Sequence, residues 1–131
     1  MKLTKYSRNR LLNTFKKWEV DKEFAEPMYN YLVHGFNPGS CFTSILANDF
    51  YGAIQRSHPA NTIPAFKALS GWLHSEVPCE AYGSYDAVND WCYLTPEQRR
   101  AVLENHEMIY TEEEEVLLIL RNQYTQEPVL Y

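Results

Sequence analysis

The sequence predicts an all-α protein, a single compact bundle of six or seven short helices with an aromatic-rich core. Apolar residues recur three and four positions apart along most of the chain, which is the helical period, and alternating strand patterns are nearly absent. Hydrophobic residues make up 45% of the 131 residues and aromatic residues 15%. This content is sufficient for one packed domain, residues 1–131, that needs neither disulfide nor metal.

The first predicted helix, within residues 1–20, is basic. Leu11, Phe15 and Trp18 share one face at helical spacing. Basic residues occupy the other face, and residues 1–17 contain no acid: the basic residues are Lys2, Lys5, Arg8, Arg10, Lys16 and Lys17. Two interpretations stay open. This helix contacts nucleic acid or an acidic partner, or it neutralises the acidic C-terminal region within the fold or across a dimer.

The next two helices surround a glycine-containing turn. Pro27 is tolerated only in a first turn, so the start of the second helix can be as late as Glu26. The pair Pro38-Gly39 fits a type II turn, because proline fixes φ and glycine accepts a positive φ. Ser40 is the expected N-cap of a third helix over residues 41–56.

The remaining helices are predicted from caps and periodic apolar residues. A helix over residues 63–75 ends before Pro78, because proline disfavours helical geometry in the residue that precedes it. A short helix follows Ser84 and carries Trp91. The clearest start lies at residues 95–98, where Thr95 is the cap, proline follows, and Gln98 is placed for a capping box.

The C-terminal region, residues 95–131, contains an unusual helix. Thr111 and Glu114 predict a second capping box, and five consecutive apolar residues, 116–120, then cover every side of the helix. Either this helix is central to the core beneath a solvated acidic cap, or one side contacts another protein or a second copy in a homodimer. In the second case the binding residues are Glu112, Glu113, Glu114, Glu115, Leu117 and Leu120.

No residue pattern supports catalysis, so we expect no enzymatic activity, metal or cofactor. The four histidines and three cysteines lack metal-site spacing. A carboxylate at Asp49, near an apolar face, requires hydrogen bonds: it either holds a neighbouring turn or contributes to a ligand pocket. That pocket would consist of Asn37, Ser40, Asn48, Asp49, Tyr82 and Ser84.

Cysteine content and hydropathy predict the compartment. The odd number of cysteines and the polar N-terminal segment indicate a reducing environment without a secretory leader. The longest purely apolar run, residues 116–120, is far shorter than the ~20 residues of a membrane span. We therefore expect a cytoplasmic protein that does not associate with membranes.

Three segments within residues 28–92 carry a resemblance. A His34-Gly35-x-x-Pro38-Gly39-Ser40 turn, an Asn48-Asp49 pair in the following helix, and a Gly83-Ser84 turn before the Trp91 helix resemble a family of short uncharacterised proteins of tailed bacteriophages. The resemblance implies a phage origin and residence in the host cytoplasm. By analogy it further implies an accessory protein that binds a host or phage protein and inhibits a host system such as anti-phage defence.

Three functions are therefore carried forward. The first is a non-catalytic phage accessory protein that binds and inhibits a host protein. The second is a small-ligand binder that sequesters a nucleotide signal in the pocket around Asp49. The third is association with nucleic acid through the basic helix.

Overall fold

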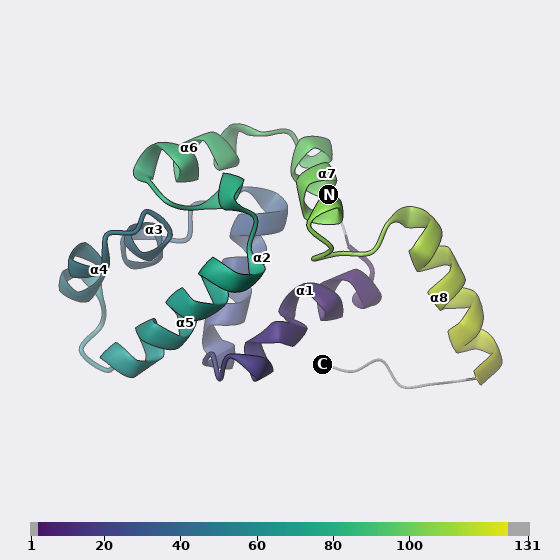
Figure 1. Ribbon diagram of the computed structural model, residues 1–131, viewed down its shortest axis with the longest axis horizontal. Helices are drawn as coiled ribbons and strands as arrows, with labels where there is room; N and C mark the ends of the chain where they lie inside the picture. Colours follow the sequence, from purple (N-terminus) through teal and green to yellow (C-terminus); the bar gives the residue numbers. More distant parts are fainter. Residues whose placement is uncertain (1–2, 126–131) are drawn as a thin grey trace.

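A computed structural model describes residues 3–125, and all of the regular secondary structure in this range is helical (Figure 1). This confirms the all-α prediction. The α-helices are α1 (Lys5–Lys17), α2 (Ala25–His34), α3 (Ser40–Leu46), α4 (Phe50–Arg56), α5 (Ile63–Glu76), α6 (Tyr85–Tyr93), α7 (Pro96–Asn105) and α8 (Glu112–Thr125). Two 3-10 helices, η1 (Lys22–Phe24) and η2 (Cys79–Ala81), precede α2 and α6.

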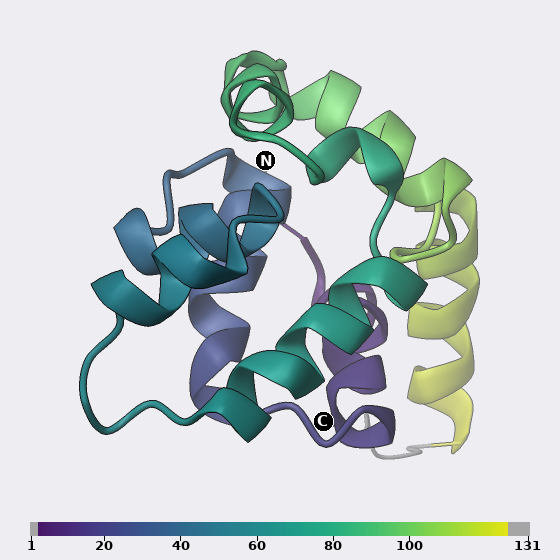
Figure 2. The same cartoon turned by 60° about the vertical axis from the view of Figure 1, so that its left-hand side comes forward.

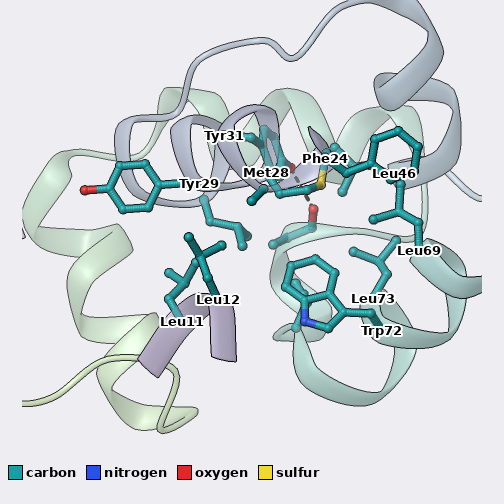
Figure 3. Packing of buried hydrophobic residues seen from close by; sticks show 14 of the residues in the cluster. Leu11, Leu12, Phe24, Met28, Tyr29, Tyr31, Leu46, Leu69, Trp72 and Leu73 are labelled. Carbon is teal, nitrogen blue, oxygen red and sulfur yellow. Dashed lines mark hydrogen bonds between the residues drawn. The ribbon is translucent and has the colours of Figure 1, made fainter. Parts of the chain in front are cut away.

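The buried hydrophobic side chains form one cluster between the helices (Figure 3). Two tryptophans in this cluster are fully buried, and the polar N–H group of each finds a hydrogen-bond acceptor. Trp72 of α5 donates its indole N–H to Thr14 Oγ1 at 2.7 Å, and Trp91 of α6 donates to the Tyr31 carbonyl at 3.1 Å. Each large ring therefore packs in the core without leaving its polar atom unpaired.

The aromatic-rich core is also confirmed. The rings of Phe24 and Phe42 meet edge to face at a centroid distance of 5.3 Å, and Phe24 stacks on Phe66 at 6.3 Å. Phe50 adds a further edge contact to Phe66 at 6.4 Å. These contacts join η1, α3, α4 and α5, so the aromatic side chains hold together segments that are distant in sequence.

Both predicted capping boxes are present. Thr95 and Gln98 form a complete capping box at the start of α7. Thr111 and Glu114 form the corresponding pair at the start of α8, with hydrogen bonds of 3.2 and 3.3 Å. Gly39 has a positive φ, 93°, but its ψ of 168° is far from the value near 0° that a type II turn requires, so the predicted turn type is wrong.

The third predicted helix is in fact two. Asn48 adopts left-handed backbone geometry (φ 65°), which ends α3 and turns the chain into α4. Asp49 is the N-cap of α4, and its carboxylate accepts the Gly52 N–H at 2.9 Å. This break raises the number of α-helices to eight over residues 3–125. Ser40, expected as a cap, is the first residue of α3, and Gly39 occupies the cap position.

The helices are arranged with α3, α4 and α6 toward one end of the molecule and α8 at the other (Figure 1). A turned view keeps α8 at the edge, next to α1 (Figure 2). None of the described helices combines the length and apolar content that a membrane crossing requires.

Candidate functional site

Helix α8 is attached to the body of the protein through its first turn. The Glu115 carboxylate accepts a hydrogen bond from the Ser7 hydroxyl of α1 and lies 3.5 Å from Arg100 Nη2 of α7. Ser7 is fully buried, Glu115 is 7% exposed, and the Ser7 hydroxyl also accepts the Tyr110 N–H at 3.1 Å. A buried polar junction therefore connects the two ends of the described chain.

Beyond its first turn, α8 exposes large apolar side chains. The exposed fractions are 55% for Val116, 67% for Leu117, 39% for Ile119 and 46% for Leu120. At 100° of rotation per residue, these four positions span an arc of about 160° around the helix. Helix α8 is thus not central to the core, and the first of the two interpretations of this segment is wrong.

The side of α8 that faces the body is narrow. Glu115 is buried, and Leu118 and Asn122 are half-buried, so contact follows one stripe at intervals of three and four residues. This stripe lies opposite the exposed apolar arc. Over residues 112–122, most of the circumference of the helix is therefore exposed.

The acidic residues of α8 divide into two groups. Glu112 and Glu113 are exposed and lie, by helical geometry, over the same arc as the apolar residues, one turn earlier. Glu114 is exposed but engaged: hydrogen bonds with Thr111 lower the pKa of its carboxyl, and Arg10 lies 3.8 Å away. Glu115 is not a surface residue. We therefore define the α8 arc as Glu112, Glu113, Val116, Leu117, Ile119 and Leu120.

The basic residues of α1 are partly engaged within the fold. Arg8 pairs with Glu26 at 3.1 Å and lies over the Tyr29 ring, and Lys17 pairs with Glu76 at 3.5 Å. Only the Arg10–Glu114 contact reaches the acidic C-terminal region, whereas the other two pairs involve acidic residues elsewhere in the chain. Each such surface pair contributes only about 0–1 kcal/mol, so their role is to occupy basic groups rather than to hold the fold.

Asp49 connects three helices. Its carboxylate accepts the Tyr85 hydroxyl of α6 at 2.6 Å and the Gly52 N–H of α4. Arg56 lies 3.6 Å from it and donates to the Ser44 hydroxyl of α3 at 2.7 Å. These hydrogen bonds, that of Tyr85 above all, lower the pKa of Asp49. A carboxylate held ionised in this way is a weak base, and its geometry is that of a structural cross-link.

A recess of about 550 Å³ lies beside this cross-link, between residues 35–43 and α6. Its lining residues are Gly35, Asn37, Thr43, Tyr85, Asp86, Val88, Asn89, Cys92 and Tyr93. Of the six residues predicted to form a ligand pocket, Asn37 lines this recess and the other five are not among its lining residues. The α6 residues of this recess were not predicted from the sequence, although their spacing opposite Val88 and Trp91 marks the second face of an amphipathic helix.

The other predicted pocket residues have separate structural positions. Ser40 and Asn48 are exposed at the two ends of α3. The Tyr82 ring makes an edge contact with His74 at 5.2 Å. Ser84 caps α6 by accepting the Ala87 N–H at 3.0 Å. Together with Asp49, these residues shape the turns around α3 and α6 instead of converging on one cavity.

The cysteines and histidines form no reactive cluster over the described range. No group of three or more potential metal ligands occurs there. Burial raises the pKa of the Cys41 and Cys92 thiols, which is the opposite of what a nucleophilic thiol requires. The position of Cys41 at the start of α3 therefore does not activate it.

Comparisons with known proteins supply no relative. No protein-family model, curated protein or solved structure matches the chain. Two features of the structure remain as candidate sites: the α8 arc and the recess lined by α6, which we call the α6 recess.

Proposed function

We propose that the chain is a non-catalytic accessory protein that binds another protein through the α8 arc. The observation that carries the proposal is the exposure of four large aliphatic side chains, including Leu117 at 67%, on a helix whose described side chains, residues 112–122, face the body along one stripe. A contiguous apolar surface of this kind, with charged residues beside it, is characteristic of sites that bind other proteins.

The size of the surface favours one kind of partner. The four side chains together expose about as much as two complete aliphatic side chains, worth roughly 3–6 kcal/mol on burial. Association costs at least about 4 kcal/mol in lost freedom. A second copy of α8 packed side by side covers only a narrow seam of the arc, so each copy contributes about half of that gain and the pair approximately balances the cost.

A concave partner gains more from the same residues. A groove that receives α8 covers the full arc of about 160° and adds the burial of its own apolar lining. Glu112 and Glu113 lie at the N-terminal end of the arc, so the matching end of the groove carries Lys or Arg side chains. We therefore propose a helix-in-groove interaction with a partner of this chemistry in preference to a homodimer.

The phage resemblance supplies the biological context of the proposal. A small phage protein that inserts a helix into a groove of a host protein would block the ligand that normally occupies it. We accordingly propose that the chain acts in the host cytoplasm as an inhibitor of a host protein, with defence systems as the first class to test. The resemblance supports this step by analogy.

The two alternatives receive less support from the described residues. Nucleic-acid binding through α1 would compete with the Arg8, Arg10 and Lys17 ion pairs. Sequestration of a nucleotide in the α6 recess would place phosphates beside Asp86, and no Lys or Arg is among the residues that line it.

Affinity purification with matched variants tests the proposal. The bait is the full chain as wild type, as Leu117→Glu/Leu120→Glu, and as Ile63→Glu, which changes a similarly exposed aliphatic residue (59%) on α5. We expect one host protein to be retained by the wild type and the Ile63 control and lost with the double variant. The purified partner should then lose activity only with the two baits that bind it. A partner retained equally by all three baits excludes the α8 arc as the binding surface.

A further inference from the structure

The α6 recess has no role in the proposed function, and its structure indicates a separate binding site. Helix α6 directs Val88 and Trp91 into the core, both at most 2% exposed. Its other face contributes Asp86, Asn89 and Tyr93 to the recess, at intervals of three and four residues. The recess is therefore bordered by a polar stripe along most of the length of α6.

The walls of the recess are held in place by the fold. Gly35 has φ 68°, and a β-carbon built there would lie 2.6 Å from Arg99 Nη1 and 3.2 Å from the Cys92 carbonyl oxygen. The loop therefore passes closely over α6 and α7. Asn37 Oδ1 accepts the Gly39 N–H at 2.9 Å and the Thr43 hydroxyl at 3.3 Å. On the other side, the Tyr85 phenol is held by Asp49. A preformed site of this kind loses little entropy when a ligand binds.

The chemistry of the lining is that of a peptide site. Asn37 presents its amide nitrogen as a donor, because its oxygen is used within the loop. Across the recess, Asn89 offers both a donor and an acceptor. These groups match the alternating C=O and N–H groups of an extended backbone, and the buried Val88 with half-buried Cys92 provides an apolar floor for a side chain.

The charge of the lining selects the side chain. Asp86 is the only charged group among the lining residues, and no ion pair within the described chain involves it. Tyr93, seven positions after Asp86 on α6, is 82% exposed. From Asp86 to Tyr93 the helix rises about 10 Å. Two residue steps of extended peptide span about 7 Å and place both side chains on the same face, and the length of a basic side chain covers the remaining distance of about 3 Å.

We propose that the α6 recess binds an extended peptide segment in which an arginine or lysine pairs with Asp86. The backbone of the segment bonds to Asn37 and Asn89, and an apolar residue two positions from the basic one packs on Tyr93. The observed recess has the volume of sites that take ligands of this size. The site lies on α6, at the end of the molecule away from α8 (Figure 1), so it does not depend on the proposed function of the α8 arc.

A peptide titration of the full chain tests the proposal. The probe is the acetylated and amidated peptide Gly-Arg-Gly-Leu, compared with Gly-Gln-Gly-Leu and with adenosine monophosphate, and followed by ¹H–¹⁵N correlation spectra. We expect saturable shifts at Asp86, Asn89 and Tyr93 with the arginine peptide. Asp86→Asn should raise Kd about tenfold, the effect of losing one charge-assisted hydrogen bond at an accessible site.

The matched control is Asp90→Asn, which removes the same charge from an exposed residue of α6 that does not line the recess. It should leave Kd unchanged, and so should Leu117→Glu/Leu120→Glu, whatever the outcome for the α8 arc. The proposal is overturned by equal binding of the glutamine peptide, by equal effects of the two aspartate variants, or by the absence of saturable shifts. Saturable shifts with the nucleotide would instead assign an anionic ligand and also overturn it.

Discussion

Because α8 is attached to the body through Glu115, we can predict how much Glu115→Ala weakens the docking of this helix. In Glu115→Ala the Ser7 hydroxyl loses its carboxylate acceptor, and Arg100 loses the carboxylate 3.5 Å away. Neither group is orphaned. Ser7 keeps the Tyr110 backbone, and Arg100 keeps Glu104 at 2.7 Å. The penalty of about 3–5 kcal/mol for an abandoned buried charge therefore does not apply.

What is lost is a hydrogen bond to a charged, buried acceptor, worth about 1.5–3 kcal/mol. We take about 2 kcal/mol, which corresponds to a change of roughly 30-fold in the equilibrium between docked and detached α8. The loss is local, because Glu115 and its contacts with Ser7 and Arg100 lie in the first turn of α8, as does the contact of Glu114 with Arg10. The loosened helix should open by itself while α5 and the core remain folded.

Native-state hydrogen exchange measures this difference. Amides within residues 116–122 should lose about 30-fold protection in Glu115→Ala, while those of Leu69 and Trp72 in α5 keep theirs. Glu113→Ala is the control, since it makes the same substitution at an exposed residue of the same turn. The reasoning fails if the two variants behave alike, or if α5 loses as much protection as α8.

Three further predictions concern the remainder of the fold. Gly35→Ala should lower the free energy of unfolding by about 2 kcal/mol or more, because the new β-carbon adds left-handed backbone strain and displaces Arg99. Gly39→Ala, with φ 93° and no atom within 4 Å of the new β-carbon, carries the backbone strain alone. The urea midpoint should therefore fall further for Gly35→Ala than for Gly39→Ala. The folded-state pKa of Asp49 lies below 3.8, so its contribution is present above that value and disappears as pH falls through the lower one. The stability advantage of wild type over Asp49→Asn should therefore shrink between about pH 5 and pH 2, and a constant difference in denaturant midpoint would contradict this. Iodoacetamide should modify exposed Cys79 before Cys41 and Cys92, whose thiol pKa values burial raises; peptide mass spectrometry gives the order, and equal rates would refute it.

The helix starts were predictable because a cap is made by residues only three positions apart. Thr95 with Gln98, and Thr111 with Glu114, form the hydrogen bonds that their spacing indicates. Helix interiors followed from apolar periodicity for the same reason, since 3.6 residues per turn is a local property.

The break at Asn48 was not predictable from periodicity, because buried residues continue at helical spacing from Ile45 to Ala53. The only local signal was the residue type. Asparagine tolerates left-handed geometry and aspartate caps helices, so an Asn-Asp pair is compatible both with one continuous helix and with a helix end followed by a new start. In the structure the break is accompanied by a contact that no local pattern indicates: the hydroxyl of Tyr85, 36 positions after Asp49, donates to the cap carboxylate.

The two candidate sites differ in how far the sequence could identify them. Five consecutive apolar residues showed that residues 116–120 could not be buried by one face, but not whether the core surrounds them. The position of this segment relative to the core is fixed by the contact of Glu115 with Ser7, which lies 108 positions away in the sequence. The α6 recess depends on the approach of Gly35 to Arg99 and Cys92, which is a tertiary event without a local pattern.

The attachment of α8 also determines how its binding should respond to mutation. A helix of 14 residues is marginal in water by itself, so the capping box and the Glu115 junction supply much of its order. A partner that binds only docked, helical α8 has an apparent Kd equal to the intrinsic value divided by the docked fraction. If the free energy of docking α8 in the wild type is much larger than about 2 kcal/mol, the docked fraction in Glu115→Ala stays near one and the affinity for the partner scarcely changes. If the free energy of docking is smaller, the affinity falls by up to about 30-fold. Partner affinity and hydrogen exchange in this variant therefore measure the same docking equilibrium by independent routes, and a loss of affinity without a loss of protection would show that Glu115 contacts the partner directly.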